Sequence, residues 1–242
     1  MKKMRLSVVL PVYSEKESVV DIVRWLRSNL RRQLYEIIIV LSPYSDAESK
    51  ATCERIAKQK YVRMVLQEIN PGIGWAYRQG FSEAAGSHLL MLDSDGEMDI
   101  TSITQMMRLF EEKNCDVVVA SRWLTGGGVE GYARIKYLYN RMFQYVFRLL
   151  FRTHIHDLSL GYKMLKSSVV KNIQWEGRFH EIATETTLKP IRYGYTVLEV
   201  PTKWTKRGAG KSKNKFRYNF RYVFMALKVL LFSGSCDLRR GQ

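Results

Sequence analysis

The stretch LLMLDSDGEMD, residues 89–99, joins an apolar run to a group of acidic residues. An uninterrupted apolar run of this kind is typical of a strand that is covered on both faces of a parallel sheet. Residues two apart on an extended chain point the same way, so Asp93 and Asp95 can face one bound ion. Carboxylate oxygens are ligands that suit Mg²⁺ or Mn²⁺. A solvated acidic turn or a helix cap would have the same composition, and the neighbouring sequence has to decide between these interpretations.

The sequence around this stretch alternates between strand and helix patterns. Strands are predicted over residues 6–12, 36–42, 61–68, 87–95 and 116–123. Helices, one of them preceded by a glycine-rich turn, are predicted over residues 17–32, 49–58, 70–86 and 101–113. This alternation indicates an α/β fold with Rossmann-like βαβ units and a mostly parallel sheet flanked by helices. Such sheets bind ligands at the carboxyl ends of their strands, which favours a metal site over a plain acidic turn.

The second half of the chain has a different pattern. Its predicted elements are a flexible loop at 125–131, a helix at 133–151, a loop and strand at 156–165, a helix near 180–190, a strand at 195–204 and a helix near 214–232. The helices at 133–151 and 214–232 are amphipathic and carry recurring basic residues. Such helices lie in a membrane headgroup layer, or pack on a core with basic outer faces, and the pattern fits both. We expect one catalytic domain over residues 1–210 and a basic amphipathic helix and tail over residues 211–242.

The charge of the chain indicates polyanionic partners. Its 39 Lys and Arg residues exceed its 23 Asp and Glu residues and give a formal net charge of +16. This suits nucleic acid, anionic lipid or phosphorylated substrates. We expect no nucleic acid partner, because the basic residues cluster on two amphipathic helices and one loop. The three cysteines are far apart, which favours a reducing compartment. No apolar run approaches the ~20 residues that span a bilayer.

Several motifs of this chain belong together. They are PVYSE at 11–15, GIGWAYRQG at 72–80, DSDGE at 93–97, SRW at 121–123, HDLSLGYKMLK at 156–166 and EVPTKWTKRGAGKSK at 199–213. In order and spacing they resemble glycosyltransferase family 2, which has the GT-A fold, and within it the dolichol-phosphate mannose synthase branch. One segment departs from that family. Members of the family have an Asp-Asp or Asp-Asn pair here that helps to hold the nucleoside, whereas VLSPYSD at 40–46 has no acid at positions 41 or 42. The choice between GDP and UDP therefore stays open.

The resemblance implies a set of site residues. Those expected at the donor are Pro11, Tyr13, Glu15, Ser42, Gly74, Tyr77, Asp93, Ser94, Asp95, Arg207 and Lys213. Those expected at a Mg²⁺ or Mn²⁺ ion are Asp93, Asp95 and Glu97, the last of which replaces a glutamine of the family. Those expected at the acceptor phosphate are Arg122, Arg134, Lys136 and Asn140. The catalytic residues are then Asp95, Arg122 and Asp157, and Glu185 falls on an acidic helix position of the family.

The resemblance also implies an inverting, metal-dependent transfer of a sugar from a nucleotide-diphosphate sugar to a polyprenyl phosphate, either dolichyl or undecaprenyl phosphate. We expect the enzyme on the cytoplasmic face of a membrane, attached peripherally or through a membrane-anchored partner subunit. A phosphate monoester is already anionic near neutral pH, so it needs no strong general base. The alternative is a family 2 enzyme acting on a saccharide or another hydroxyl acceptor, for which Asp157 or Glu185 would supply the base.

Overall fold

The structure, a computed structural model, describes residues 4–206 and 220–232. Its main sheet has the order β3-β2-β1-β4-β7-β5-β8. These strands are β1 (Leu6–Val12), β2 (Leu34–Leu41), β3 (Val62–Leu66), β4 (His88–Met91), β5 (Val117–Ser121), β7 (Lys163–Lys166) and β8 (Val197–Pro201). Strand β7 lies antiparallel between β4 and β5, and the other neighbours in this sheet are parallel. The predicted mostly parallel α/β sheet is therefore confirmed.

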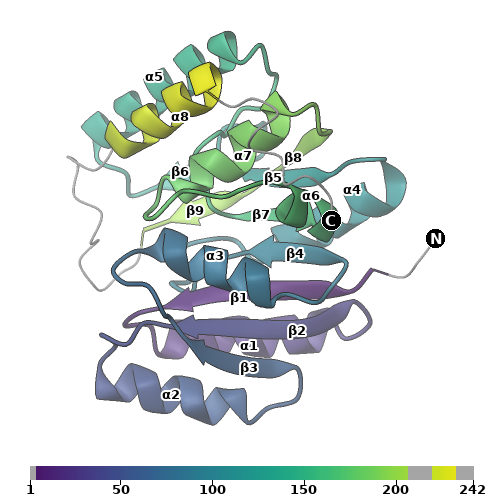
Figure 1. Ribbon diagram of the computed structural model, residues 1–242, viewed down its shortest axis with the longest axis vertical. Helices are drawn as coiled ribbons and strands as arrows, with labels where there is room; N and C mark the ends of the chain where they lie inside the picture. Colours follow the sequence, from purple (N-terminus) through teal and green to yellow (C-terminus); the bar gives the residue numbers. More distant parts are fainter. Residues whose placement is uncertain (1–3, 207–219, 233–242) are drawn as a thin grey trace.

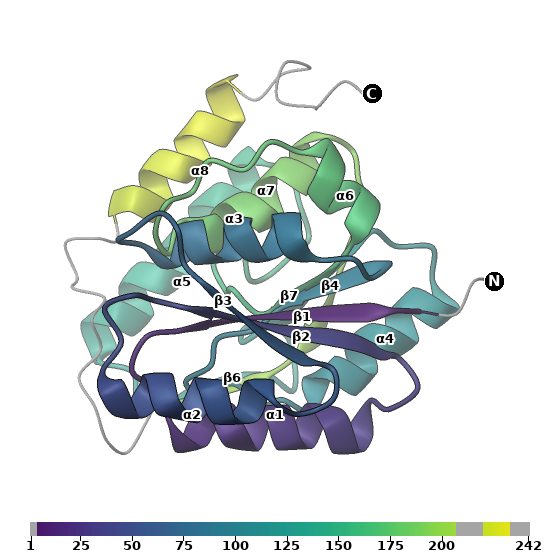
Figure 2. The same cartoon turned by 60° about the horizontal axis from the view of Figure 1, so that its bottom comes forward.

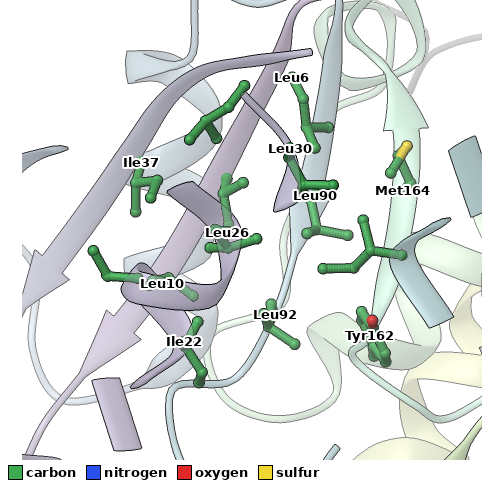
Figure 3. Packing of buried hydrophobic residues seen from close by; sticks show 14 of the residues in the cluster. Leu6, Leu10, Ile22, Leu26, Leu30, Ile37, Leu90, Leu92, Tyr162 and Met164 are labelled. Atoms are coloured by element: carbon green, nitrogen blue, oxygen red, sulfur yellow. The ribbon is translucent and has the colours of Figure 1, made fainter. Parts of the chain in front are cut away.

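Helices cover both faces of this sheet (Figure 1; Figure 2). One face carries α1 (Glu17–Asn29), α2 (Ala47–Ala57) and α4 (Ser102–Glu112). The other carries α3 (Ile73–Glu83), α5 (Arg134–Leu150), α6 (Ser167–Asn172), α7 (Ile182–Arg192) and α8 (Phe220–Phe232). Side chains alternate along each strand, so Val8 of β1 belongs to the first core and Val9 to the second. Figure 3 shows the first core, where Leu26 of α1 lies near Leu10 and Leu90 of the sheet.

Some element predictions differ from the structure. The predicted loop at 125–131 contains β6 (Gly128–Glu130), which pairs with β9 (Lys203–Thr205) in a second, two-stranded sheet. The predicted strand at 195–204 is therefore two strands, β8 and β9, that belong to different sheets. Helix α6 has no counterpart in the sequence prediction, because its six residues are too few to show a helical repeat.

The acidic pair does not lie on a strand. Strand β4 ends at Met91, and Asp93 and Asp95 fall in the turn that follows it. The argument that an extended chain points both carboxylates the same way is thus wrong in its geometry. Their position beyond the carboxyl end of a buried parallel strand is nevertheless as predicted.

Helix α3 packs very closely on β1 at one glycine. A Cβ atom added at Gly80 would lie 2.3 Å from Cγ1 of Val9 and 3.0 Å from its Cγ2. Both residues are buried and the valine belongs to β1, which has a strand on either side, so neither has room to move away. Glycine at this position therefore sets the distance between the helix and the sheet.

We predict that Gly80→Ala lowers the free energy of unfolding by about 1–3 kcal/mol, because the added methyl overpacks the core. Urea denaturation of the full chain measures it. Gly128→Ala is the matched control, since a Cβ there meets nothing within 4 Å, and it should change the free energy by less than about 0.5 kcal/mol. Adding Val9→Ala should cost less in the Gly80→Ala background than alone. Equal effects of the two glycine substitutions would contradict the packing argument.

Candidate active site

The carboxyl ends of β1 and β4 are joined by hydrogen bonds between their loops. The Ser94 hydroxyl donates to the Pro11 carbonyl, and the Ser18 hydroxyl donates to the Ser94 carbonyl over 2.8 Å. The Glu15 carboxylate accepts the backbone N–H of Tyr13 at 2.8 Å. The structure thus places four predicted donor residues side by side at one edge of the sheet.

Two further predicted donor residues have local structural reasons for their identity. Ser42 directly follows β2, where its N–H donates to the Val12 carbonyl over 2.9 Å and its hydroxyl accepts the N–H of Tyr44. Gly74 opens α3 where the backbone of another segment passes very close: an added Cβ would lie 2.5 Å from the carbonyl carbon of Arg178. The glycine therefore admits the 176–181 segment to this edge.

Negative charge is concentrated where β4 ends. Asp93 accepts a hydrogen bond from the Tyr77 hydroxyl, with 2.6 Å between the oxygens. Burial raises the pKa of Asp93, and the carboxylates of Glu97 and Glu15 raise it further, against the Tyr77 hydrogen bond. Asp95 accepts the backbone N–H of Glu97 at 3.0 Å. Neighbouring carboxylates therefore repel one another here.

This donor set fits a divalent cation that completes its coordination with a substrate. Over residues 4–206 and 220–232, no group of three or more His, Cys, Asp or Glu side chains is arranged to hold a metal by itself. Mg²⁺ usually takes only one or two carboxylates together with substrate phosphates and water. A cation would also relieve the repulsion around Asp93. Asp93 and Asp95 are the residues that would hold it, and a contact from Glu97 stays a prediction.

A buried ion pair lies beside the carboxylates. The Arg122 guanidinium donates twice to Asp157, from Nε to Oδ2 over 2.7 Å and from Nη2 to Oδ1 over 2.9 Å. Its Nη1 donates to the Tyr132 hydroxyl over 2.6 Å. The side chains of Arg122 and Asp157 are 5% and 0% exposed. Burial lowers the pKa of the Arg122 guanidinium, but Asp157 and the nearby tyrosines together outweigh burial and raise it, so the positive charge here is permanent.

The structure does not support a general base role for either predicted carboxylate. Both oxygens of Asp157 accept from Arg122, and its side chain is 0% exposed, which leaves no approach for an acceptor hydroxyl. Glu185 is also fully buried, and it accepts the backbone N–H groups of Glu176 and Gly177 at 2.8 and 2.7 Å. Asp157 is therefore a positioning residue for Arg122, and Glu185 holds a loop.

Lys136 is the predicted acceptor residue that the structure brings to Arg122. Its Nζ lies 4.5 Å from the ring centroid of Tyr132 and 5.5 Å from that of Trp204. Burial lowers the pKa of Lys136 and the charge of Arg122 lowers it further, whereas Glu97 raises it. These influences show that the lysine, the guanidinium and the acidic turn share one electrostatic environment.

Of the other predicted acceptor residues, Asn140 lies near Arg122 and Arg134 is exposed to solvent. Asn140 donates to the Ser159 hydroxyl over 3.3 Å, and the same hydroxyl accepts from Arg122 at 3.2 Å. Arg134 is exposed at the start of α5. Arg207 and Lys213 lie outside the described residues, as does the predicted domain boundary near residue 210.

The structure adds residues that the sequence prediction missed. Tyr132 holds Arg122, and its place directly before the 133–151 helix pattern could have drawn attention to it. His180 lies near Asp93, and burial lowers the pKa of its imidazole. The half-buried Tyr222 of α8 lies near Arg122 and Asp93, and burial raises the pKa of its phenol. His180 and Tyr222 are far in sequence from the residues they lie near, so no local sequence pattern indicates their place in the site.

Helices α5 and α8 lie side by side at one end of the molecule (Figure 1) and expose large apolar side chains. Nine of these are more than half exposed and are called the α5–α8 face: Ile135, Leu138, Met142, Tyr145, Leu149, Phe220, Phe224, Leu231 and Phe232. The opposite sides of the helices enter the second core through Phe143, Phe147, Met225 and Val229. Pure core packing with basic outer faces is thus contradicted, because the outer faces are apolar as well. No helix in the described part of the chain is long and apolar enough to cross a membrane.

Comparison with known proteins is consistent with this geometry. The family model described as Glycosyl transferase family 2 matches residues 7–174. The chain is 25% identical to a protein of Pyrococcus furiosus called dolichol-phosphate mannosyltransferase, over 97% of this chain and 66% of that one. It is 24% identical to polyprenol monophosphomannose synthase of Mycolicibacterium smegmatis, over 98% of this chain and 91% of that one. The chain thus spans slightly less than two thirds of the Pyrococcus relative.

Solved structures with the same fold include glucosyl-3-phosphoglycerate synthase from Mycobacterium tuberculosis in complex with Mn²⁺, uridine diphosphate and glucosyl-3-phosphoglycerate. That chain aligns with a TM-score of 0.73 at 14% identity, over 96% of this chain and 82% of that one. The GT-A fold is therefore shared. Because the family model covers most of the chain, the protein belongs to glycosyltransferase family 2 and is a glycosyltransferase.

Proposed function

We propose that this glycosyltransferase moves a sugar from a nucleoside-diphosphate sugar to a polyprenyl phosphate, with inversion at the anomeric carbon, on the cytoplasmic face of a membrane. The observation that carries the proposal is the meeting of three features: the acidic turn at Asp93, the cations Arg122 and Lys136, and the starts of α5 and α8. A lipid-linked anion needs a cationic site and an apolar surface next to each other. The names of the Pyrococcus and Mycolicibacterium relatives agree with this substrate class.

The chain's own residues supply most of what this reaction requires. Arg122 offers a fixed charge and Lys136 a second one, so the donor and acceptor phosphates can approach despite their mutual repulsion. The acceptor oxygen is already ionised, which agrees with the absence of a base role for Asp157 and Glu185. A divalent cation held by Asp93 and Asp95 would neutralise charge on the leaving diphosphate. The saccharide acceptor is disfavoured because neither predicted base is accessible.

A hollow beside α8 supports a lipid acceptor. It has a volume of about 500 Å³ and is lined by Glu176, Arg178, Phe179, Glu181, Phe220, Arg221, Phe224, Met225 and Lys228. Three phenyl rings give it apolar walls, and Glu181 also faces His180 of the candidate site. The first isoprene units of an acceptor would lie against these rings while the rest of the lipid follows the α5–α8 face into the membrane.

A donor panel tests the proposal. Purified full-length protein is incubated with radiolabelled GDP- and UDP-linked sugars, Mg²⁺ or Mn²⁺, and a short polyprenyl phosphate in detergent. We expect one donor to give an organic-extractable product whose sugar is labile to mild acid. The absence of such a product from every donor, together with transfer to a free saccharide, would establish the hydroxyl-acceptor alternative.

We predict that Asp95→Asn lowers kcat/KM by roughly 100-fold or more, because it removes a negative charge that would hold the cation on the leaving diphosphate. Binding of Mn²⁺ with the nucleoside diphosphate, followed by calorimetry, should weaken in parallel and gives a readout apart from turnover. Asp99→Asn is the matched control, since its carboxylate is exposed and accepts only from Thr101 among the described contacts. An active Asp95→Asn variant with unchanged Mn²⁺ binding would refute the metal assignment.

We predict that Asp157→Asn raises the acceptor KM about tenfold or more and leaves the pH–rate profile unchanged in shape, because it disorders Arg122 without removing a proton acceptor. It should also reduce the free energy of unfolding by about 3–5 kcal/mol, since a buried charge loses its partner. Asp21→Asn, at an exposed pair with Arg24, is the control and should do neither. Loss of the acidic limb of the profile would show instead that Asp157 is a base.

A further inference from the structure

A second hollow lies between three helix ends. It has a volume of about 370 Å³ and is lined by Leu150, Phe151, Arg152, Ile191, Arg192 and Leu230. These residues come from the ends of α5, α7 and α8, which gather on one side of the molecule in Figure 1. The starts of α5 and α8 contribute Lys136 and Tyr222 near Arg122 instead. The hollow is therefore at the far end of the α5–α8 face from the candidate active site.

The two arginines of this hollow carry charges that are not paired with any described side chain. Both are exposed, and within the described parts of the chain neither forms an ion pair or hydrogen bond through its guanidinium. Arginines near helix C-termini do complement the helix dipoles. That effect requires only proximity to the last carbonyl groups, and it does not explain why two such residues share one hollow with an apolar lining.

The backbone at Arg152 adds an independent observation. Its φ is 48°, in the left-handed region, directly after α5. The N–H of Thr153 donates to the Arg148 carbonyl over 3.1 Å, which closes the helix end. Glycine or asparagine is the usual residue at such a position, and other side chains are disfavoured by roughly 1 kcal/mol. The chain thus keeps a long cationic side chain where a small residue would be more stable.

A ligand for this hollow needs both an anion and an apolar part. A phosphate would lie between Arg152 and Arg192, whereas Leu150, Phe151 and Leu230 offer nothing to a free inorganic ion. The exposed residues Leu149 and Leu231 of the α5–α8 face lie in the same helical turns as the lining residues Leu150 and Leu230, so the hollow is close to that face. This combination matches the glycerophosphate end of a membrane lipid.

We propose that this hollow binds the headgroup of an anionic phospholipid and forms a second membrane contact, distinct from the acceptor site. The proposal rests on the proposed membrane attachment of the α5–α8 face. One contact near Lys136 and another at the far ends of the helices would fix the tilt of the face against the bilayer. The catalytic edge would then stay at the depth where a lipid phosphate lies.

The test compares full-length variants in vesicle co-sedimentation. Arg152→Asn with Arg192→Gln removes both charges, and asparagine suits the left-handed position, so the melting temperature should be unchanged or slightly higher. We expect the dissociation constant for mixed phosphatidylcholine–phosphatidylglycerol vesicles to rise about tenfold or more. Arg31→Gln with Arg32→Gln removes the same charge from the exposed turn between α1 and β2, and it should change binding less than about threefold.

Three results would overturn the proposal. Equal losses in the two double variants would mean that the overall charge of the chain binds the vesicles. Equal binding of the wild-type protein to pure phosphatidylcholine vesicles would mean that no anion is recognised. Displacement by millimolar inorganic phosphate would mean that the hollow takes a free phosphate. Sugar transfer to a detergent-dispersed acceptor should be unaffected by Arg152→Asn with Arg192→Gln, so failure of the proposed function and failure of this site are separate outcomes.

Discussion

The pair between Arg122 and Asp157 is the interaction on which the candidate site depends. A guanidinium that is 5% exposed is stable only if its partner satisfies it in good geometry, and the bidentate contact does so. The loop that follows Asp157 is in turn held by α5: the Leu158 N–H donates to Gln144 over 2.8 Å, and Gln144 donates to Ser159 over 2.9 Å. One buried charge thus fixes the end of β5, the 157–159 loop and the middle of α5 relative to one another.

A second network ties α8 to the donor side. Glu185 holds the backbone of the 176–181 segment and pairs with Lys189 at 2.8 Å. Glu176, within that segment, pairs with Lys189 at 3.1 Å and with Lys228 of α8 at 2.6 Å. Because the same segment passes over the glycines that open α3, its position matters to both sides of the site. Helix α8 is therefore connected to the donor edge through charges as well as through the apolar core.

Local sequence patterns predicted the parallel part of this fold well, and non-local contacts limited the rest. The run at 89–92 indicated a buried strand and correctly placed Asp93 at its carboxyl end. The same reasoning could not reveal that both carboxylate oxygens of Asp157 accept hydrogen bonds from Arg122, because the two residues are 35 positions apart and meet only in the folded chain. Strand β6 was invisible for a similar reason: three residues of a glycine-rich loop become a strand only by pairing with β9. Periodicity predicts an element's buried face, whereas partner choice is a tertiary property.

The β6–β9 ribbon explains how opposite charges stay close without cancelling. The Thr205 N–H donates to the Glu97 carbonyl over 2.9 Å, so β9 is attached to the acidic turn by its backbone. From the same strand, Trp204 extends under Lys136 together with Tyr132. Cation–π contacts stabilise an ammonium group without neutralising it, and Lys136 forms no ion pair with any residue in the described ranges. The lysine is thereby held near the acidic turn while its charge remains available to a phosphate.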